Sequence, residues 1–273
     1  MTRMTFRVAA VTAVAAMATI GMSTASAHPS AAAAAPRANS AVAHRIVGFG
    51  KHFGHATNGA TTDYNWAGYA QTGANGSAKT TSATWTVPTL STKYNGYSST
   101  WVGVDGFNNS YLTQTGTEAD VVNGQVQYDA WWEVITPSDE APETLFSTLT
   151  VKPGDSITAS VTTTGSKSTM KLVDNTTGKS ASHTASYKGP GSSAEWIQED
   201  TDVNGDISAA PDWHSITFSN ILRNGANPDL QSSQSLDIVD QNGTQETSTS
   251  APNSAGNGFT TTWLATGTPT PVD

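Results

Sequence analysis

Carboxylates and tryptophan rings are the side chains of this sequence best suited to chemistry, and they lie close together along the chain. Carboxylates act as general acids and bases, and tryptophan rings can line a groove for an extended polypeptide or glycan. The residues in question are Asp105, Asp129, Glu133, Glu195 and Glu199, with Trp66, Trp85, Trp101, Trp131, Trp132, Trp196 and Trp213. Because most tryptophans of a β-sandwich belong to its core, this clustering does not by itself identify an active site.

Composition excludes several other kinds of site. The chain has 273 residues and no cysteine, so a cysteine nucleophile, a zinc finger and an iron–sulfur cluster are excluded. It lacks the serine-hydrolase elbow, the zinc-protease helix motif, the phosphate loop and the dinucleotide fingerprint. A formal charge of −9 argues against nucleic-acid binding. We therefore expect no cofactor and no nucleic-acid partner.

The first 27 residues have the pattern of a secretory signal peptide. Arg3 and Arg7 precede an apolar run from Val8 to Met22, and the small residues of Ala25–Ala27 follow. Since this run is shorter than the roughly 20 residues that span a membrane, we expect cleavage after Ala27 and an exported protein without a membrane anchor.

Residues 28–62 are interpreted as a pro-segment or linker. They are rich in Ala, Pro, Gly and His and show no sustained periodicity. Up to Thr62 the chain has five basic residues and no acidic one, which leaves eight basic and 22 acidic residues beyond it. The hypothesis is that this basic arm covers an acidic cleft near neutral pH and is removed in acid, where its histidines become charged. A disordered spacer is the alternative.

Residues 63–273 are predicted to form one all-β domain. Period-2 alternation recurs in short segments separated by turn signals such as Lys152–Asp155, Asn175–Gly178, Asn224–Gly225 and Asn242–Gly243. The expected strands include Ala83–Val87, Leu149–Val151, Ile157–Val161, Met170–Leu172, Ile216–Phe218 and Leu236–Ile238. Thr and Ser at alternate positions favour antiparallel sheets with one wet face, hence a β-sandwich of two antiparallel sheets of the concanavalin or lectin type.

Six blocks occur in a distinctive order: Asn65–Gly68, Ala83–Pro88, Trp101–Gly106, Leu112–Gly116, Tyr128–Glu133 and Ala194–Asp200. In this order they resemble blocks of the glutamic peptidases, or eqolisins, and the chain looks like a secreted bacterial relative of them. The resemblance implies a sandwich of two antiparallel sheets, an endopeptidase that works in acid, and a catalytic pair of one glutamine and one glutamate. The chain departs from the fungal enzymes in having no cysteine and in Val134-Ile135 after Glu133.

Carried over by position, the resemblance implies Gln114 and Glu199 as the catalytic pair. Glu199 would take a proton from the attacking water and return it to the leaving amine, while the amide of Gln114 would orient the water and stabilise the oxyanion. Glu195 shares the face of Glu199 but lies two pleats away, so it is expected not to serve the same atom. The implied substrate-binding residues are Trp66, Trp101, Asp105, Trp131 and Glu133. By alternation, Trp131 and Glu133 share one face of their strand, and Trp132 has the other.

Residues 200–206 resemble the opening half of a calcium loop. Candidate oxygen ligands stand at alternate positions, Asp200, Asp202, Asn204 and Asp206, with Gly205 at the sixth. The twelfth position is Pro211, where such a loop needs a bidentate glutamate. A plain acidic turn is the competing interpretation, so the overall expectation is no metal.

Two other functions fit part of the pattern. A glycoside hydrolase could use two carboxylates such as Glu133 and Glu199, with tryptophans stacked on sugar rings. A carbohydrate-binding module would suit the Ser- and Thr-rich surface. Both leave Gln114 and the pro-segment without a role, so an acid endopeptidase that acts as a monomer on polypeptides, away from membranes, is preferred.

Overall fold

The computed structural model describes residues 42–43, 60–139 and 142–271, and in these ranges the regular secondary structure is almost all β-strand, joined by turns and irregular loops. The helical element described there is one 3-10 turn, η1 (Ser232–Gln234). No helix in the described part of the chain has the length and apolar character needed to cross a membrane.

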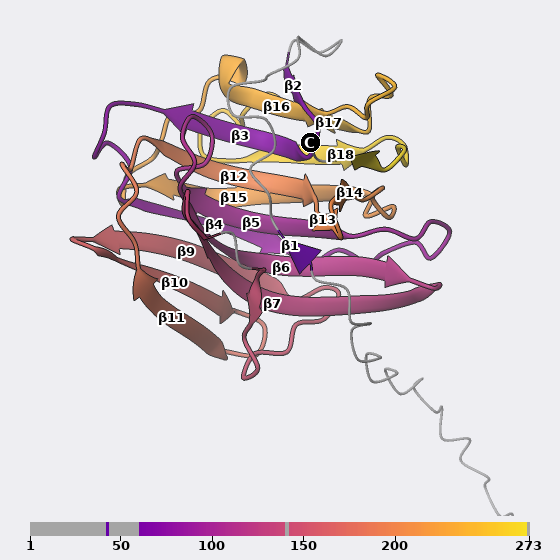
Figure 1. Cartoon of the computed structure of the whole chain (residues 1–273), viewed down its shortest axis with the longest axis horizontal. Coiled ribbons are helices and arrows are strands. Elements are labelled where there is room, and N and C mark those ends of the chain that lie inside the picture. Colours follow the sequence, from indigo (N-terminus) through magenta and orange to yellow (C-terminus); the bar gives the residue numbers. More distant parts are fainter. Residues whose placement is uncertain (1–41, 44–59, 140–141, 272–273) are drawn as a thin grey trace, which may run out of the picture. The chain divides into compact units, whose positions relative to one another are not determined.

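Two large sheets make up the domain (Figure 1). The eight-stranded sheet has the order β2 (Thr61–Asp63), β16 (Ser235–Ile238), β3 (Trp66–Thr72), β12 (Ser193–Asp200), β5 (Ser98–Val104), β6 (Leu112–Val122), β7 (Gln125–Ile135) and β8 (Thr144–Leu145). The seven-stranded sheet has the order β11 (Ser180–Ser186), β10 (Lys167–Asp174), β9 (Ser156–Thr164), β4 (Thr80–Thr86), β15 (Ser215–Arg223), β18 (Phe259–Trp263) and β17 (Thr247–Thr249). Neighbouring strands are antiparallel apart from the parallel pair β2–β16. The predicted sandwich of two antiparallel sheets is confirmed.

The main core lies between the two sheets. Alternate side chains of each sheet point inward, as the period-2 pattern requires. Val102, Val104 and Trp196 of the eight-stranded sheet join one buried cluster with Trp85 and Ile157 of the other. This packing fixes which residues of β5, β6, β7 and β12 remain for the opposite face.

That opposite face of the eight-stranded sheet, here called the site face, holds a second buried apolar cluster. It consists of Trp66, Ala70, Trp101, Leu112, Trp131, Ile135, Ile197 and Leu236. Gln114, Glu133, Glu195 and Glu199 share this face, because they lie at even spacing from members of the cluster on the same strands.

One predicted strand is wrong. Leu149–Val151 is not a strand; the chain turns there, with the Leu149 amide donating to the Phe146 carbonyl over 3.1 Å. Leu149 and Val151 are nevertheless buried in the main core. The alternation of apolar residues therefore correctly predicted that these side chains point into the core, although no neighbouring strand pairs with this segment.

A small third sheet joins β1 (Val42–Ala43), β13 (Asp202–Val203), β14 (Asp206–Ile207) and β19 (Thr270–Pro271). In it Val42 pairs with Val203 and Ala43 with Asp202. A short strand from the region before the domain is thus hydrogen-bonded just beyond the end of β12.

Candidate active site

The strand register sets four residues in one row across the site face. On β6, Gln114 pairs with Gly103 of β5 on one side and with Glu133 of β7 on the other. Gly103 pairs in turn with Glu195 of β12. Directly paired residues of antiparallel strands point to the same face, so the row reads Glu195, Gly103, Gln114, Glu133.

Gly103 lets the side chains of Trp101 and Leu112 lie close over the strand between the two polar side chains that flank it. A Cβ at this position would lie 2.8 Å from Cζ3 of Trp101 and 3.0 Å from Cδ1 of Leu112, closer than side chains normally approach. Two strand spacings put the Cα atoms of Gln114 and Glu195 about 10 Å apart. Both side chains point to the site face, so this Cα separation is compatible with their approaching each other above Trp101 and Leu112.

The amide of Gln114 is held at one end. Its Nε2 donates to Oε2 of Glu133 over 2.7 Å, which fixes which end of the amide is nitrogen. Its Oε1 is buried and accepts no hydrogen bond within the described part of the chain. An amide nitrogen carries two N–H groups, so a second donor and an acceptor remain for a ligand in the row.

Glu195 is a fully buried carboxyl, and neither of its oxygens accepts a well-aligned hydrogen bond from the described residues, although the Ser193 hydroxyl lies near enough to favour the ionised form. Burial raises the pKa of Glu195 well above the ordinary value; the Ser193 hydroxyl and the positive charge of Arg223 offset part of this rise, and the negative charge of Asp105 adds to it. A buried polar group without a partner costs free energy, so such a group points to function. A carboxyl with a raised pKa is a stronger base once ionised, and it stays protonated up to a higher pH than an ordinary carboxyl.

Glu199 lies elsewhere on the site face. It pairs with Ser99 of β5 and Trp66 of β3, four residues and about 13 Å along the strand from the row of Gln114. The register therefore does not bring Glu199 to Gln114, contrary to the pairing expected from the sequence. Glu195, which lies two pleats from Glu199 as expected, is instead the glutamate that is level with Gln114.

Asp105 is buried at the end of β5 and anchors a loop. Its φ of 70° lies in the left-handed region. Its carboxylate accepts hydrogen bonds from the Tyr187 hydroxyl at 2.7 Å, the Gly191 amide at 2.8 Å, the Ser192 amide at 2.7 Å and Nδ2 of Asn109 at 2.8 Å. Because this loop leads into β12, the expected substrate contact is better described as a support for the strand that carries Glu195.

The remaining residues expected to bind substrate do share the site face. Trp66 and Trp101 pack edge to face with ring centroids 5.0 Å apart, and Nε1 of Trp131 donates to Oγ of Ser99 over 3.1 Å. Trp132 has the other face of β7, as alternation predicted, and its ring stacks on His183 with centroids 3.7 Å apart.

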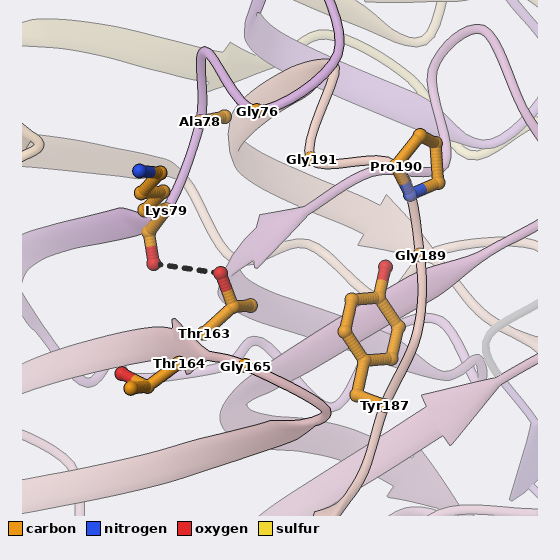
Figure 2. A pocket seen from close by; sticks show the side chains of 10 residues that line it. All are labelled: Gly76, Ala78, Lys79, Thr163, Thr164, Gly165, Tyr187, Gly189, Pro190 and Gly191. Carbon is orange, nitrogen blue, oxygen red and sulfur yellow. Dashed lines mark hydrogen bonds between the residues drawn. The ribbon is translucent and has the colours of Figure 1, made fainter.

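Two pockets adjoin the site. One of about 270 Å³ is lined by Glu133 and includes Trp132, Thr136 and Ser186. Another, of about 360 Å³, lies between Lys79 and Thr163 on one side and Tyr187 on the other (Figure 2). Since the hydroxyl of Tyr187 donates to Asp105, this second pocket borders the anchored loop rather than the row itself.

The candidate calcium ligands do not converge. Asp202 and Asp206 belong to the two strands of a tight hairpin in which Asp202 pairs with Ile207 and Val203 with Asp206. Asp202 and Asp206 therefore point to opposite faces of the hairpin. Oδ1 of Asp202 accepts the Gly205 amide over 3.0 Å, as in an ordinary turn. Within the described ranges, no three His, Cys, Asp or Glu side chains come together as metal ligands would.

Comparison with known proteins places this geometry in a family. The Peptidase A4 family matches residues 64–263. Aspergillopepsin-2 of Aspergillus niger is 35% identical over 173 residues, 61% of this chain and 59% of its own length. Scytalidopepsin B of Scytalidium lignicola is 36% identical over 148 residues, 52% of this chain and 53% of its own. The aligned part thus spans between half and three fifths of these two relatives.

Solved structures of glutamic peptidases also match this chain. A crystal structure of scytalido-glutamic peptidase with a transition-state analogue inhibitor matches 74% of this chain and 99% of that one, with a TM-score of 0.58 and 25% identity. The aspergilloglutamic peptidase from Aspergillus niger matches 62% of this chain and 99% of that one, with a TM-score of 0.52 and 33% identity. The chain belongs to the Peptidase A4 family, the glutamic peptidases or eqolisins that its sequence blocks resemble.

Proposed function

We propose that this protein is a secreted endopeptidase that hydrolyses peptide bonds in acid, with Gln114 and Glu195 as its catalytic pair. The observation that carries the proposal is their position in one row of the sheet, on either side of Gly103. Membership of a peptidase family supports the reaction, and the unsatisfied polar atoms of both side chains support the choice of residues.

The proposed mechanism uses one water between the two side chains. Glu195, ionised, takes a proton from this water as its oxygen attacks the carbonyl carbon of the substrate. The second N–H of Gln114 donates to the oxyanion that forms, while Oε1 of Gln114 accepts the remaining hydrogen of the attacking water. Glu195 then gives its proton to the leaving nitrogen as the C–N bond breaks, and returns to the carboxylate.

Glu133 has a supporting role in this mechanism. By accepting one N–H of Gln114, it keeps the amide nitrogen and oxygen from exchanging places. Burial, which raises the pKa of Glu195, makes its carboxylate a stronger base toward the attacking water.

The geometry does not favour the glycosidase alternative. Along the strand direction, Glu199 is four residues, or about 13 Å, from the row that contains Glu133. Across the sheet, the two glutamates are three strands, or about 14 Å, apart. Glycosidase carboxyl pairs lie roughly 5–9.5 Å apart.

The test of function is proteolysis of acid-denatured casein or haemoglobin between mild acid and neutral pH, with an inhibitor of aspartic dyads present or absent. Wild-type protein should cleave with and without the inhibitor, and Gln114→Ala should not cleave while keeping a native circular dichroism spectrum. Release of reducing sugar from a glycan, with no protein cleavage, would overturn the proposal.

Residues 28–62 are proposed to act as a pro-segment. The pairing of Val42–Ala43 with β13 supports attachment close to the end of β12, and the basic charge before Asp63 complements the acidic remainder. A synthetic peptide of residues 28–62 should inhibit the mature enzyme near neutral pH and release it in acid. Mass spectrometry showing a fully active secreted chain that starts at His28 would contradict this role.

A further inference from the structure

Glu199 is a buried carboxyl that accepts two hydrogen bonds from the site face. Nε1 of Trp101 donates to its Oε2 over 2.6 Å, and Nδ2 of Asn65 donates to its Oε1 over 2.9 Å. All three side chains are almost fully buried, with at most 1% of each residue exposed. The hydrogen bond from Trp101 is short for an N–H donor, so Glu199 fixes the nitrogen-bearing edge of this indole.

The opposite edge of the same indole reaches the catalytic row. Cζ3 and Cε3 of Trp101 lie 2.8 Å and 3.4 Å from the position that a Cβ of Gly103 would occupy. These carbons belong to the six-membered ring, on the far side of the indole from Nε1. One rigid ring therefore extends from Glu199 to the space between Gln114 and Glu195.

A second tryptophan limits the movement of the first. Trp66, which pairs with Glu199 in the register, packs edge-on against Trp101 at an interplanar angle of 79°. Its Cη2 lies 3.1 Å from the position that a Cβ of Gly106 would occupy, beyond the end of β5. With Trp66 on one side, the hydrogen bond to Glu199 selects the orientation of Trp101.

We infer that Glu199 is a positioning residue, which acts through Trp101 to shape the floor between Gln114 and Glu195. The inference rests on the proposed function of that pair. Without an acceptor, the buried N–H of Trp101 would lose its partner and the ring would turn toward another. Because a displacement of about 1 Å at a reacting centre can cost roughly 100-fold in rate, the effect reaches catalysis although Glu199 exchanges no proton with substrate.

The test compares Glu199→Gln with Glu199→Leu. The glutamine keeps an oxygen for the indole N–H, and Asn65 can rotate to match the new amide, so kcat should stay within about tenfold of wild type. The shape of the pH–rate profile should not change. Leucine removes the acceptor, so kcat should fall roughly 100-fold while KM changes less than about threefold. Asp174→Asn, which alters the carboxyl of the last residue of β10, is the control and should leave kcat unchanged.

A double-mutant cycle decides the matter even if Glu199→Leu does not fold. Trp101→Phe keeps a ring but removes the N–H, so adding Glu199→Met to it should cost less than about threefold more, because the contact is already lost. Glu199→Met alone removes the acceptor with an unbranched side chain, and it should lose about as much kcat as Glu199→Leu. Independent, multiplicative losses would overturn the inference. Abolished activity in a folded Glu199→Gln variant, or loss of an ionisation from its pH profile, would also overturn it. Failure of the proposed function is distinguishable, because it would appear as retained activity in Glu195→Gln.

Discussion

Glu195 lies directly across Gly103 from Gln114, and the side chains of both point to the same face of the eight-stranded sheet. This relationship brings an amide with a free acceptor next to a buried carboxyl with a raised pKa. The same register distinguishes two glutamates of the same strand parity: Glu195 is level with Gln114 and is the proposed catalytic glutamate, whereas Glu199 accepts a hydrogen bond from Trp101.

The close approach of Trp101 to Gly103 can be tested by adding a methyl group at position 103. Gly103→Ala would put a methyl group 2.8 Å from Trp101, between Gln114 and Glu195. We expect a loss of about 1–3 kcal/mol in the free energy of unfolding from overpacking, and a fall in kcat of roughly 100-fold or more. Urea denaturation and steady-state kinetics measure the two effects. Wild-type kcat in this variant would contradict a water site above Gly103.

Asp105 should matter for stability more than for substrate affinity. Asp105→Asn removes one of two acceptor oxygens that hold Tyr187, Gly191 and Ser192, so the free energy of unfolding should fall by about 2 kcal/mol. KM should change little, and kcat should fall moderately because the loop leads into β12. A large rise in KM with unchanged stability would instead restore Asp105 as a substrate contact.

Glu133 should act through Gln114. In Glu133→Ala the Nε2 of Gln114 loses its acceptor at 2.7 Å, so the amide is no longer held in one orientation. We expect kcat to fall about tenfold or more, in line with the loss of one buried side-chain hydrogen bond. Steady-state kinetics on a short peptide would detect it, and an unchanged kcat would show that other contacts orient Gln114.

The protein should be more stable in acid than at neutral pH. Burial raises the pKa of Glu246 to about 7, and burial together with the charge of Glu246 raises the pKa of Asp200 well above the ordinary value. Groups with a raised folded-state pKa bind protons more tightly when folded, so their stabilisation is complete below the unfolded pKa and is lost as pH rises through the folded one. The melting temperature should therefore fall between about pH 4.5 and pH 7 and beyond.

Glu246→Gln should flatten that fall, because the glutamine needs no proton to stay neutral. Asp174→Asn is the matched control with the opposite sign. Burial raises the pKa of Asp174, but hydrogen bonds from Thr177 and Thr176 outweigh it and lower the pKa. Its stabilisation is lost only at the acid end of the range. Thermal melts across pH separate the two, and a melting temperature in Glu246→Gln that declines as steeply as in wild type would contradict the assignment.

Alternation and turn chemistry were enough to predict the sandwich. Segments such as Ile157–Val161 and Met170–Leu172 lie within observed strands, and Asn224–Gly225 is a turn with both residues at positive φ. The prediction of a strand at Leu149–Val151 was wrong because side chains that point into the core do not require a hydrogen-bonded neighbouring strand. The family also followed from the order of the sequence blocks.

Which glutamate to propose as the catalytic one could not be decided from the sequence pattern. Glu195 and Glu199 have the same strand parity, so alternation puts both on one face and cannot rank them. Only the register of β12 against β5 and of β5 against β6 decides which one is level with Gln114. The glycine at position 103 was the available signal, since a residue without a side chain marks a place of close approach.

The most direct test of this account is kcat/KM for Glu195→Gln on a denatured protein in mild acid, measured beside Glu199→Gln. A general acid–base group contributes about 10²- to 10⁴-fold, so Glu195→Gln should lose at least roughly 1,000-fold while remaining folded. Glu199→Gln should keep most of its activity. Near-normal cleavage by Glu195→Gln, with none by a folded Glu199→Gln, would contradict the account.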